Sequence, residues 1–449
     1  MHRYDLISCH DCGVLYRKRA VGPRERARCG RCERVLYRGT SAGRSTGMKR
    51  RYGLSGQDAR TVNKMAAIVL GALLTFLIAQ FFPIVQLNVN GTTSSATLLG
   101  AIGVLWTERM QVVASVVFCF TILFPMVELG AMLHVTLSLR AGHIPPGFHR
   151  LLRAVHAVRQ WGMTEVLMLG ILVTIIKMTS LARVMPEPAL FAFGALTLML
   201  AVVSHFDPRT LWDIGDRVGE RSATRQGRTP DLPLAAAVHA ADGRRLLACD
   251  ACGLLNMAGR SDASVKRLAC ARCGSTLHRR HPDSVRRTWA MLLAAAVLYI
   301  PANLLPVMYT RTLLTNQDDT IISGVMFFWH SGSKALAIII FTASILVPVL
   351  KLVVLALLAF TAQRGSRWRP LQRTKLYRLV EFVGRWSMLD IFVVTLTVAL
   401  VRFQSLAVIT AGPGALAFCA VVVLTMLAAL QFDPRLIWDP VDPHGEKHV

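Results

Sequence analysis

Eight of the ten cysteines fall into two sets with the spacing of a metal-binding module. In each set, two cysteines separated by two residues are followed, after 16 or 17 residues, by a second pair of the same kind. Two thiolates in one tight turn point at the same ion, and four complete the tetrahedron that Zn²⁺ prefers, with no vacant position for catalysis. The spacing therefore predicts two structural zinc ions. Their ligands are Cys9, Cys12, Cys29 and Cys32 in the first set, and Cys249, Cys252, Cys270 and Cys273 in the second.

Two other uses of these cysteines stay open. The C-x-x-C pairs could be redox-active or form disulfides, although no thioredoxin-like pattern of strand and helix surrounds them. Zinc ribbons can also bind nucleic acid, and the first module is rich in arginine. Each module spans only about 25 to 35 residues, too few for a self-sufficient core, so a metal would supply the missing folding free energy.

Ionisable side chains inside apolar stretches form the second group of candidates. Each costs at least about 2.5 to 3.5 kcal/mol at the centre of a membrane helix, so each is a candidate for a functional role. They occupy matched places when the two halves of the chain are aligned. The matched pairs are Glu128 with Lys351, Glu165 with Asp390, and Lys177 with Arg402.

Two interpretations of these charges compete. Glu165 and Asp390 could cap helix starts, while Lys177 and Arg402 extend to the outer headgroups. Glu128 and Lys351 lie deeper, each three residues after a proline, where a kinked helix is tolerated mainly beside protein or a cavity. These two opposite charges could pair across the halves, although a pair between Lys351 and Asp390 is equally reachable.

The elements that must position these residues are membrane helices. The chain has 449 residues, of which 53% are hydrophobic and 17% charged, and its apolar runs approach the length of roughly 20 residues that crosses a bilayer. No cleavable signal peptide is expected, because cysteines and arginines occupy the N-terminal region. The predicted spans are Asn63 to Phe82, Val112 to Val135, Met163 to Leu181, Ala189 to Ser204, Met291 to Val307, Leu336 to Phe360, Ile391 to Ala407 and Ala415 to Leu430.

The net charge of +25 follows the membrane rather than a nucleic-acid surface. Arginine and lysine crowd into the first 64 residues and into residues 140–159, 209–287 and 364–385. The alternate connections carry few of them. By the positive-inside rule, both termini and the middle segment, with both cysteine modules, are expected in the cytoplasm.

A direct repeat relates the two halves. Both halves carry the cysteine module, a Leu-x-Pro motif, a Trp-x-Met motif and, at the end, Phe-Asp-Pro-Arg-x-x-Trp-Asp, in the same order. Because each half has four predicted spans, both enter the membrane from the same side, and the axis relating them runs along the membrane normal. The fold class predicted is an all-α polytopic membrane protein of two tandem four-helix transmembrane units, each preceded by a small cytoplasmic zinc ribbon.

The predicted boundaries follow from this repeat. The two ribbons occupy residues 1–38 and 244–282, and the two transmembrane domains occupy residues 62–214 and 283–440. Basic or small-residue stretches connect them. These are a linker at 39–61, a second linker at 215–243 and a C-terminal tail at 441–449.

Two further segments are expected at the membrane surfaces. In the Phe-Asp-Pro-Arg-x-x-Trp-Asp repeats, Asp207 and Asp433 suit helix caps, and Trp212 and Trp438 suit the headgroup layer. The sequence therefore predicts an anchoring role for this motif. The runs Thr97 to Trp106 and Thr320 to Trp329 are too short to span and are expected at the outer interface.

The cysteine modules, the run from Pro301 to Met308 (Pro-Ala-Asn-Leu-Leu-Pro-Val-Met) and the doubled Phe-Asp-Pro-Arg-x-x-Trp-Asp resemble the paraquat-inducible protein A family, which includes the lipophilic envelope-spanning tunnel protein A. The resemblance covers nearly the whole chain. It implies a tetraspanin-like four-helix architecture with an extended element after the first helix of each unit. It also implies a place in the inner membrane of diderm bacteria, beside a periplasmic partner of mammalian-cell-entry domains that forms a tunnel for phospholipid.

The resemblance is fuller in the second half. The first half has Gln80-Phe-Phe-Pro83 where the second has the Pro-Ala-Asn run, which includes Asn303. We therefore expect the halves to differ in role and place the lipid-handling cavity, with Asn303, in the second half.

The leading hypothesis is a lipid-transport subunit that is not an enzyme. The sequence has no phosphate-binding loop, nucleophile elbow or zincin motif. The alternatives are a membrane thiol oxidoreductase, which would contain titratable disulfides and no metal, and a membrane-bound regulator whose ribbons bind nucleic acid in a salt-sensitive way.

Overall fold

The computed structural model is mostly helical, and the part of the chain that it describes also forms six small sheets. The first half of the chain and its repeat in the second half carry the same elements in nearly the same order. The residues described are 6–17, 25–38, 56–89, 92–178, 183–204, 210–216, 218, 245–258, 268–278, 280–312, 316–332, 334–400, 402–403 and 407–441.

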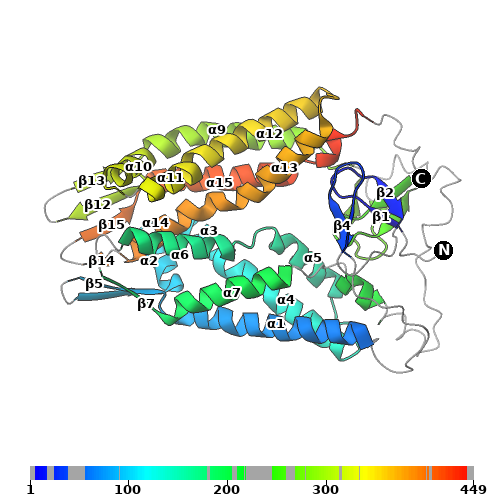
Figure 1. Ribbon diagram of the computed structural model, residues 1–449, viewed down its shortest axis with the longest axis horizontal. Coiled ribbons are helices and arrows are strands. Elements are labelled where there is room, and N and C mark those ends of the chain that lie inside the picture. Colours follow the sequence, from blue (N-terminus) through cyan, green and yellow to red (C-terminus); the bar gives the residue numbers. More distant parts are fainter. Residues whose placement is uncertain are drawn as a thin grey trace.

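The helices run along the long axis of the molecule (Figure 1). The two ribbons lie at one end of the helices, and the sheets of the membrane domains lie at the other end. This separation agrees with the alternation predicted from the charges, in which basic segments and weakly charged connections lie on opposite sides.

The first half begins with α1 and ends with a short helix at residues 210–216. Its elements are α1 (Gly56–Phe81), β5 (Val85–Val89), β6 (Thr92–Ala96), α2 (Leu98–Thr107), α3 (Gln111–Phe118), η1 (Cys119–Leu123), α4 (Phe124–Arg140), α5 (Phe148–Arg159), α6 (Thr164–Met178), β7 (Arg183–Pro186) and α7 (Pro188–Ser204).

The second half repeats this order and adds one strand. Its elements are α9 (Ser284–Leu304), β12 (Met308–Thr312), β13 (Asn316–Asp319), α10 (Ile321–His330), α11 (Lys334–Phe341), η4 (Thr342–Leu346), α12 (Val347–Gln363), α13 (Pro370–Gly384), η5 (Arg385–Met388), α14 (Leu389–Leu400), β14 (Arg402–Phe403), β15 (Ala407–Ala411), α15 (Pro413–Gln431) and η6 (Pro434–Ile437).

Within the described residues, seven helical stretches are long and apolar enough to cross a membrane. Each overlaps one of the eight predicted spans. The remaining prediction, Ala189 to Ser204, coincides with α7, which is apolar but has only 17 residues. The seven stretches are Ala59–Phe81, Gln111–Arg140, Phe148–Ile176, Ser284–Leu304, Ala337–Gln363, Pro370–Leu400 and Pro413–Gln431.

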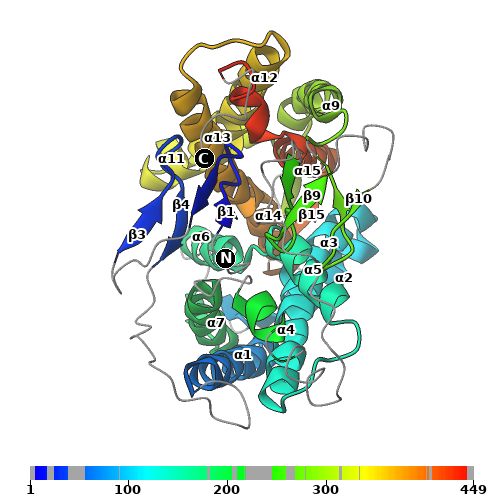
Figure 2. The ribbon, with the colours of Figure 1, turned by 90° about the vertical axis from the view of Figure 1, so that its right-hand side faces the viewer.

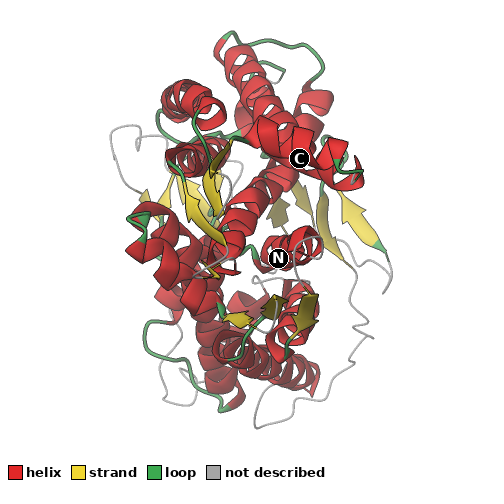
Figure 3. Cartoon of the chain, turned by 90° about the vertical axis from the view of Figure 1, so that its left-hand side faces the viewer, coloured by secondary structure: helices red, strands yellow, loops and turns green. Residues whose placement is uncertain are grey.

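The connections at the far end form sheets that the sequence analysis did not resolve as strands. In the first half, β5 pairs with both β6 and β7 in antiparallel fashion. In the second half, the strand order is β13-β12-β15-β14. Figure 3 looks at the molecule from this end. The segments 97–106 and 320–329 follow β6 and β13 as the short helices α2 and α10, each capped by its threonine.

A π-turn interrupts the second long helix of each half at the same place. It covers Cys119–Leu123 in the first half and Thr342–Leu346 in the second, just before Pro125 and Pro348. Proline has no N–H, and its ring crowds the carbonyl one turn earlier, so the wider turn accommodates the missing hydrogen bond. This wider turn lies five to nine residues before Glu128 and Lys351, in the same helices.

The halves meet where α6 packs against α14. These two helices are repeat equivalents, so the contact lies on the axis that relates the halves. A Cβ placed on Gly170 of α6 would lie 3.0 Å from the Cβ of Phe392. The absence of a side chain at Gly170 therefore allows the two helices to approach closely.

Two four-cysteine metal centres and the buried charges

Each set of four cysteines converges on one point. In both sets, the four Sγ atoms lie within 4.8 Å of one another, and all eight side chains are buried. Close contacts run between knuckles, the turns that carry each C-x-x-C. Cys9 and Cys32 are 3.4 Å apart and Cys12 and Cys29 are 3.5 Å apart. In the second ribbon, Cys249 lies 3.5 Å from Cys273, and Cys252 lies 3.6 Å from Cys270.

These distances fit a tetrahedral metal centre. Four thiolates about 2.3 Å from a zinc ion stand roughly 3.8 Å from one another, whereas sulfurs in a disulfide are about 2.05 Å apart. All ten cysteines are free thiols. All four sulfurs of each set lie together within 4.8 Å, whereas a redox-active dithiol needs only the two sulfurs of one C-x-x-C pair. The arrangement favours a structural metal over thiol oxidation.

In each ribbon, two β-hairpins place the four thiols in this geometry. The hairpins β1 (Leu6–Ser8) with β2 (Leu15–Arg17) and β3 (Arg26–Arg28) with β4 (Val35–Arg38) carry the first set. The hairpins β8 (Arg245–Ala248) with β9 (Leu255–Ala258) and β10 (Leu268–Ala269) with β11 (Thr276–Leu277) carry the second. Each knuckle closes with a positive-φ residue, which is glycine at Gly13, Gly253 and Gly274 and Glu33 in the remaining one.

An equivalent side chain in each ribbon supports the third cysteine. The hydroxyl of Tyr16 lies 3.2 Å from the Sγ of Cys29. In the second ribbon the same place is taken by Asn256, whose Nδ2 lies 3.6 Å from the Sγ of Cys270. Donors to a thiolate of this kind orient it and stabilise its charge. The sequence analysis did not identify either residue.

The carboxylate beside the first knuckle is held by cations. Burial alone would raise the pKa of Asp11, but its hydrogen bond with His10 and the nearby Arg34 and Arg378 hold that pKa below its usual value. Asp11 is therefore ionised at neutral pH. It forms part of the surface by which the first ribbon contacts the second half.

The prediction that Trp212 and Trp438 anchor the chain in the headgroup layer is wrong. Only 1% of Trp212 and 6% of Trp438 is exposed. Trp212 stacks on His149, with ring centroids 5.5 Å apart, and the Nε1 of Trp438 donates to the Oγ1 of Thr374 over 3.0 Å. Both indoles are packed inside the protein, so neither is available to lipid. Asp433 caps η6 as predicted, and Asp207 lies outside the described residues.

The deep charges are each held within their own half. Glu128 is 7% exposed and its Oε1 lies 3.9 Å from the Nε of Arg159. Lys351 is 1% exposed and its Nζ lies 3.4 Å from the Oγ of Ser387. The contacts found for these two side chains therefore do not join Glu128 to Lys351. The sequence analysis missed both Arg159 and Ser387.

The other intramembrane candidates are placed only by their backbones. Lys177 lies in the last turn of α6, and Asp390 is the second residue of α14. The predicted span Ile391 to Ala407 is too long, because α14 ends at Leu400 and Arg402 lies in β14, paired with Val408 of β15. The side chains of these three residues lie outside the described set.

Asn303 and its equivalent Gln80 differ in environment. The Nδ2 of Asn303 donates to the carbonyl of Tyr299 in its own helix, over 2.8 Å. Gln80 is 6% exposed, and neither its Nε2 nor its Oε1 has a hydrogen-bond partner within the described structure. Leaving such an amide unpaired costs about 1 to 3 kcal/mol, so Gln80 is a candidate polar site that the sequence analysis did not select. Asn303 is the second-last residue of α9, which leads into β12.

The fold and site define a multi-pass membrane protein with two buried four-cysteine clusters that can hold metal ions. The family described as paraquat-inducible protein A matches residues 62–215 and 285–442. The chain belongs to this family, as the sequence motifs predicted.

The curated relatives match over almost their whole length. The intermembrane transport protein PqiA of Escherichia coli is 32% identical over 99% of both chains. The lipophilic envelope-spanning tunnel protein A of the same organism is 31% identical over 97% of this chain and 92% of its own. A probable intermembrane transport protein of Haemophilus influenzae is 28% identical over 98% and 97%. No solved structure matches the chain.

Proposed function

We propose that this protein is the inner-membrane subunit of a phospholipid transport system, and that it loads or receives lipid for a periplasmic tunnel of mammalian-cell-entry domains. The observation that carries the proposal is the match, over 99% of both chains, to a protein named for intermembrane transport. The relative named as an envelope-spanning tunnel protein supports the lipophilic cargo. In this proposal the protein is not an enzyme.

The proposed architecture is two tandem four-helix units, at residues 62–214 and 283–440, with ribbons at 1–38 and 244–282. In this arrangement α7 and α15, which both follow the last strand of a unit's sheet, are equivalent fourth helices. The 17 residues of α7 extend about 26 Å, slightly less than the hydrocarbon core of about 30 Å. The ribbons and both termini face the cytoplasm, and the sheets face the periplasm. The metal in each ribbon is zinc.

The lipid path is proposed to pass the buried charges. A phospholipid headgroup carries a phosphate. The cationic side chain of Lys351 is suited to attract this phosphate when a displacement of α12 lets the headgroup enter. At the equivalent place in the first half, Glu128 carries the opposite charge. The residues Asp390, Lys177, Arg402 and Asn303 remain proposed members of this path.

The proposal is tested by identifying the protein and lipid that copurify with the chain. Purification of the full chain from native membranes in mild detergent should recover a periplasmic ring-forming protein and phospholipid together. Mass spectrometry of the extract identifies both. If the chain is recovered in abundance and neither component accompanies it, the proposal is refuted.

A further inference from the structure

The two ribbons are exchanged between the halves of the molecule. The first ribbon precedes the first half in sequence but lies against α13 of the second half, whereas the second ribbon lies near α5 of the first half (Figure 2). Equivalent residues of the two ribbons make this exchange. Arg31 and Arg272 both lie between the two cysteines of a second knuckle, in the sequences Cys29-Gly30-Arg31-Cys32 and Cys270-Ala271-Arg272-Cys273.

Arg31 of the first ribbon binds the tryptophan that ends the second half. Its guanidinium lies 4.5 Å from the centroid of the Trp438 ring, and its Nη2 donates to the carbonyl of Trp438 over 3.4 Å. A guanidinium stacked on an indole is a favourable cation–π contact, and Trp provides the best ring for it. The first ribbon is therefore held by the end of the second repeat.

Further contacts fix the same ribbon on α13. The Nε of Arg378 donates to the Oδ2 of Asp11 over 2.7 Å, and its Nη2 donates to the carbonyl of Cys32 over 2.9 Å. At the surface, Lys375 pairs with Glu33 at 2.8 Å. Because Arg378 contacts both knuckles of the ribbon, its two hydrogen bonds fix the orientation of the metal centre relative to α13.

Arg272 of the second ribbon makes the reciprocal contact. Its guanidinium lies 5.6 Å from the centroid of Trp212, the equivalent tryptophan at the end of the first half. Its Nη2 donates to Asp213 over 3.0 Å and to Asp216 over 2.7 Å. Burial acts to lower the pKa of Arg272, but the carboxylates of Asp216 and Asp213 raise it above its usual value. Its side chain is 6% exposed and is paired with two carboxylates.

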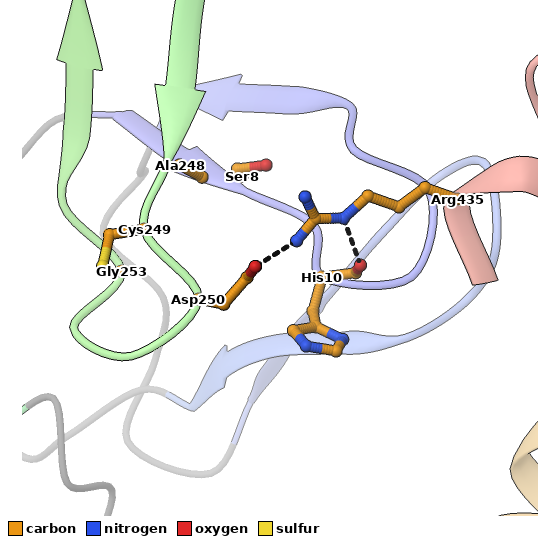
Figure 4. A pocket seen from close by; sticks show the side chains of 7 residues that line it. All are labelled: Ser8, His10, Ala248, Cys249, Asp250, Gly253 and Arg435. Atoms are coloured by element: carbon orange, nitrogen blue, oxygen red, sulfur yellow. Dashed lines mark hydrogen bonds and ion pairs between the residues drawn. The ribbon is translucent and has the colours of Figure 1, made fainter. Parts of the chain in front are cut away.

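Arg435 joins the two ribbons to each other. It lies on η6 of the second half, donates from Nε to the carbonyl of His10 over 3.2 Å, and pairs through Nη2 with Asp250 (Figure 4). His10 and Asp250 are equivalent residues of the two first knuckles. Strand β1 of one ribbon also lies beside β9 of the other. The ribbons thus form one unit at this end of the helices.

We propose that the tryptophan of each Phe-Asp-Pro-Arg-x-x-Trp-Asp repeat is a binding site for the other half's ribbon, which it recognises through the arginine inside the second knuckle. Each ribbon then joins the ends of both halves. Because the arginine is flanked by two metal ligands, its position depends on the knuckle that the metal orders. Loss of metal from a ribbon should release the opposite half at this end while leaving the contact between α6 and α14.

The exchange is tested by crosslinking in the full chain. A protease site inserted after Gly227 allows the purified protein to be cut into a fragment with the first ribbon and first half and a fragment with the second ribbon and second half. A photoreactive benzoylphenylalanine replaces Lys375 on α13, and irradiation precedes cutting. The exchanged arrangement predicts that the two fragments remain joined on a denaturing gel, at the mass of one chain. The same replacement at Leu293 on α9, which is 62% exposed, serves as the control and should join no fragments.

Two outcomes would overturn the exchange. Fragments that separate after irradiation would place the first ribbon on its own half. A product with the mass of two chains in the irradiated sample before cutting would place the exchange between copies. The role of the arginine is tested in the crosslinkable protein by Arg31→Ala, which should reduce the joined product at least fivefold. Arg26→Ala removes the same charge from an exposed strand of that ribbon and should leave the yield unchanged. Equal yields for both variants would refute recognition through Arg31.

Metal dependence has its own measurement. A chelator that strips the ribbons, followed by elemental analysis, should reduce the joined product in proportion to the metal lost. Re-addition of Zn²⁺ should restore it. An unchanged yield in metal-free protein would show that the ribbons dock without their metal and would overturn this part of the proposal.

Discussion

The Nζ of Lys351 lies 3.4 Å from the Oγ of Ser387. At the equivalent place in the first half, Glu128 lies next to Arg159 and Gly162. In the repeat, Ser387 corresponds to Gly162, and Gly384 corresponds to Arg159. A Cβ added to Gly384 would lie 3.9 Å from the Cε of Lys351. The second half thus has a cation where the first has an anion, and a glycine where the first has the neutralising arginine. The duplicated site was kept, but its charge was reversed together with its surroundings.

Replacing Lys351 with methionine should impair lipid transfer more than stability. The lysine has a neutral serine as its partner, so its removal leaves no opposite charge among the described contacts of this site, and methionine fills a similar volume. We expect a loss of transfer of at least tenfold with a change in melting temperature of only a few degrees. The control is Lys334→Met, at the exposed start of α11. Normal transfer by Lys351→Met would exclude the lysine from the lipid path.

The two deep charges should act independently. Because Glu128 and Lys351 make their contacts within separate halves, the stability effects of Glu128→Gln and Lys351→Met should add to within about 0.5 kcal/mol in the double variant. By contrast, Glu128→Gln and Arg159→Met, whose residues are in contact, should show a coupling of roughly 0.5 to 3 kcal/mol. Unfolding of the wild type, the three single variants and the two double variants in the same detergent measures both quantities. Strong coupling between Glu128 and Lys351 would mean that they pair across the halves.

Metal analysis should find two zinc ions per chain, one for each cysteine set. Cys252→Ser and Cys273→Ser should each lower the zinc content to about one ion and reduce the yield of folded protein, because the ribbon depends on its metal for folding free energy. Cys119→Ser and Cys419→Ser are the matched controls, because these cysteines lie in the helical bundle, away from both clusters. Iron in place of zinc, or a stable reduced protein without metal, would contradict the structural-zinc assignment.

A reporter active only in the periplasm should be inactive after Gly227 and after Val449. Both positions lie on the ribbon side in the proposed topology, which the positive-inside rule supports. The same reporter after Gly332, in the turn between α10 and α11 at the sheet end, should be active. Activity at Gly227 or Val449 would reverse the assignment and with it the expectation that the cysteines remain reduced.

Gly170→Val should weaken the packing between the halves. The added side chain starts 3.0 Å from the Cβ of Phe392, tighter than carbons ordinarily pack, and the two further methyl groups of valine add to the crowding, so we expect α6 and α14 to shift apart. Overpacking of this kind costs about 1 to 3 kcal/mol. Gly130→Val on α4 is the control, since an added Cβ there meets no atom within 4 Å. Equal melting temperatures for the two variants would show that the contact does not limit stability.

Short sequence spacings determined the metal centres and the membrane character of this protein. A C-x-x-C turn orients its two thiols locally, so the eight ligands could be named without a fold, and uninterrupted apolar runs identify membrane helices because the bilayer thickness sets their length. An extended element after the first helix of each unit was expected from the family resemblance, and β5 and β12 lie there. The sheets that these strands form with β7 and β15 were not predicted, because those partners lie far away in sequence and the pairing, rather than local propensity, stabilises them.

Only the tertiary structure decided which distant groups meet. Sequence equivalence suggested Glu128 and Lys351 as partners, but the helix packing places Arg159 and Ser387 next to them. The amphipathic character of Trp212 and Trp438 suited a membrane surface, yet both indoles are buried and receive an arginine from the other half's ribbon. Local sequence specifies what a residue can bind, whereas the partner it does bind depends on which helices and ribbons the chain brings together over hundreds of residues.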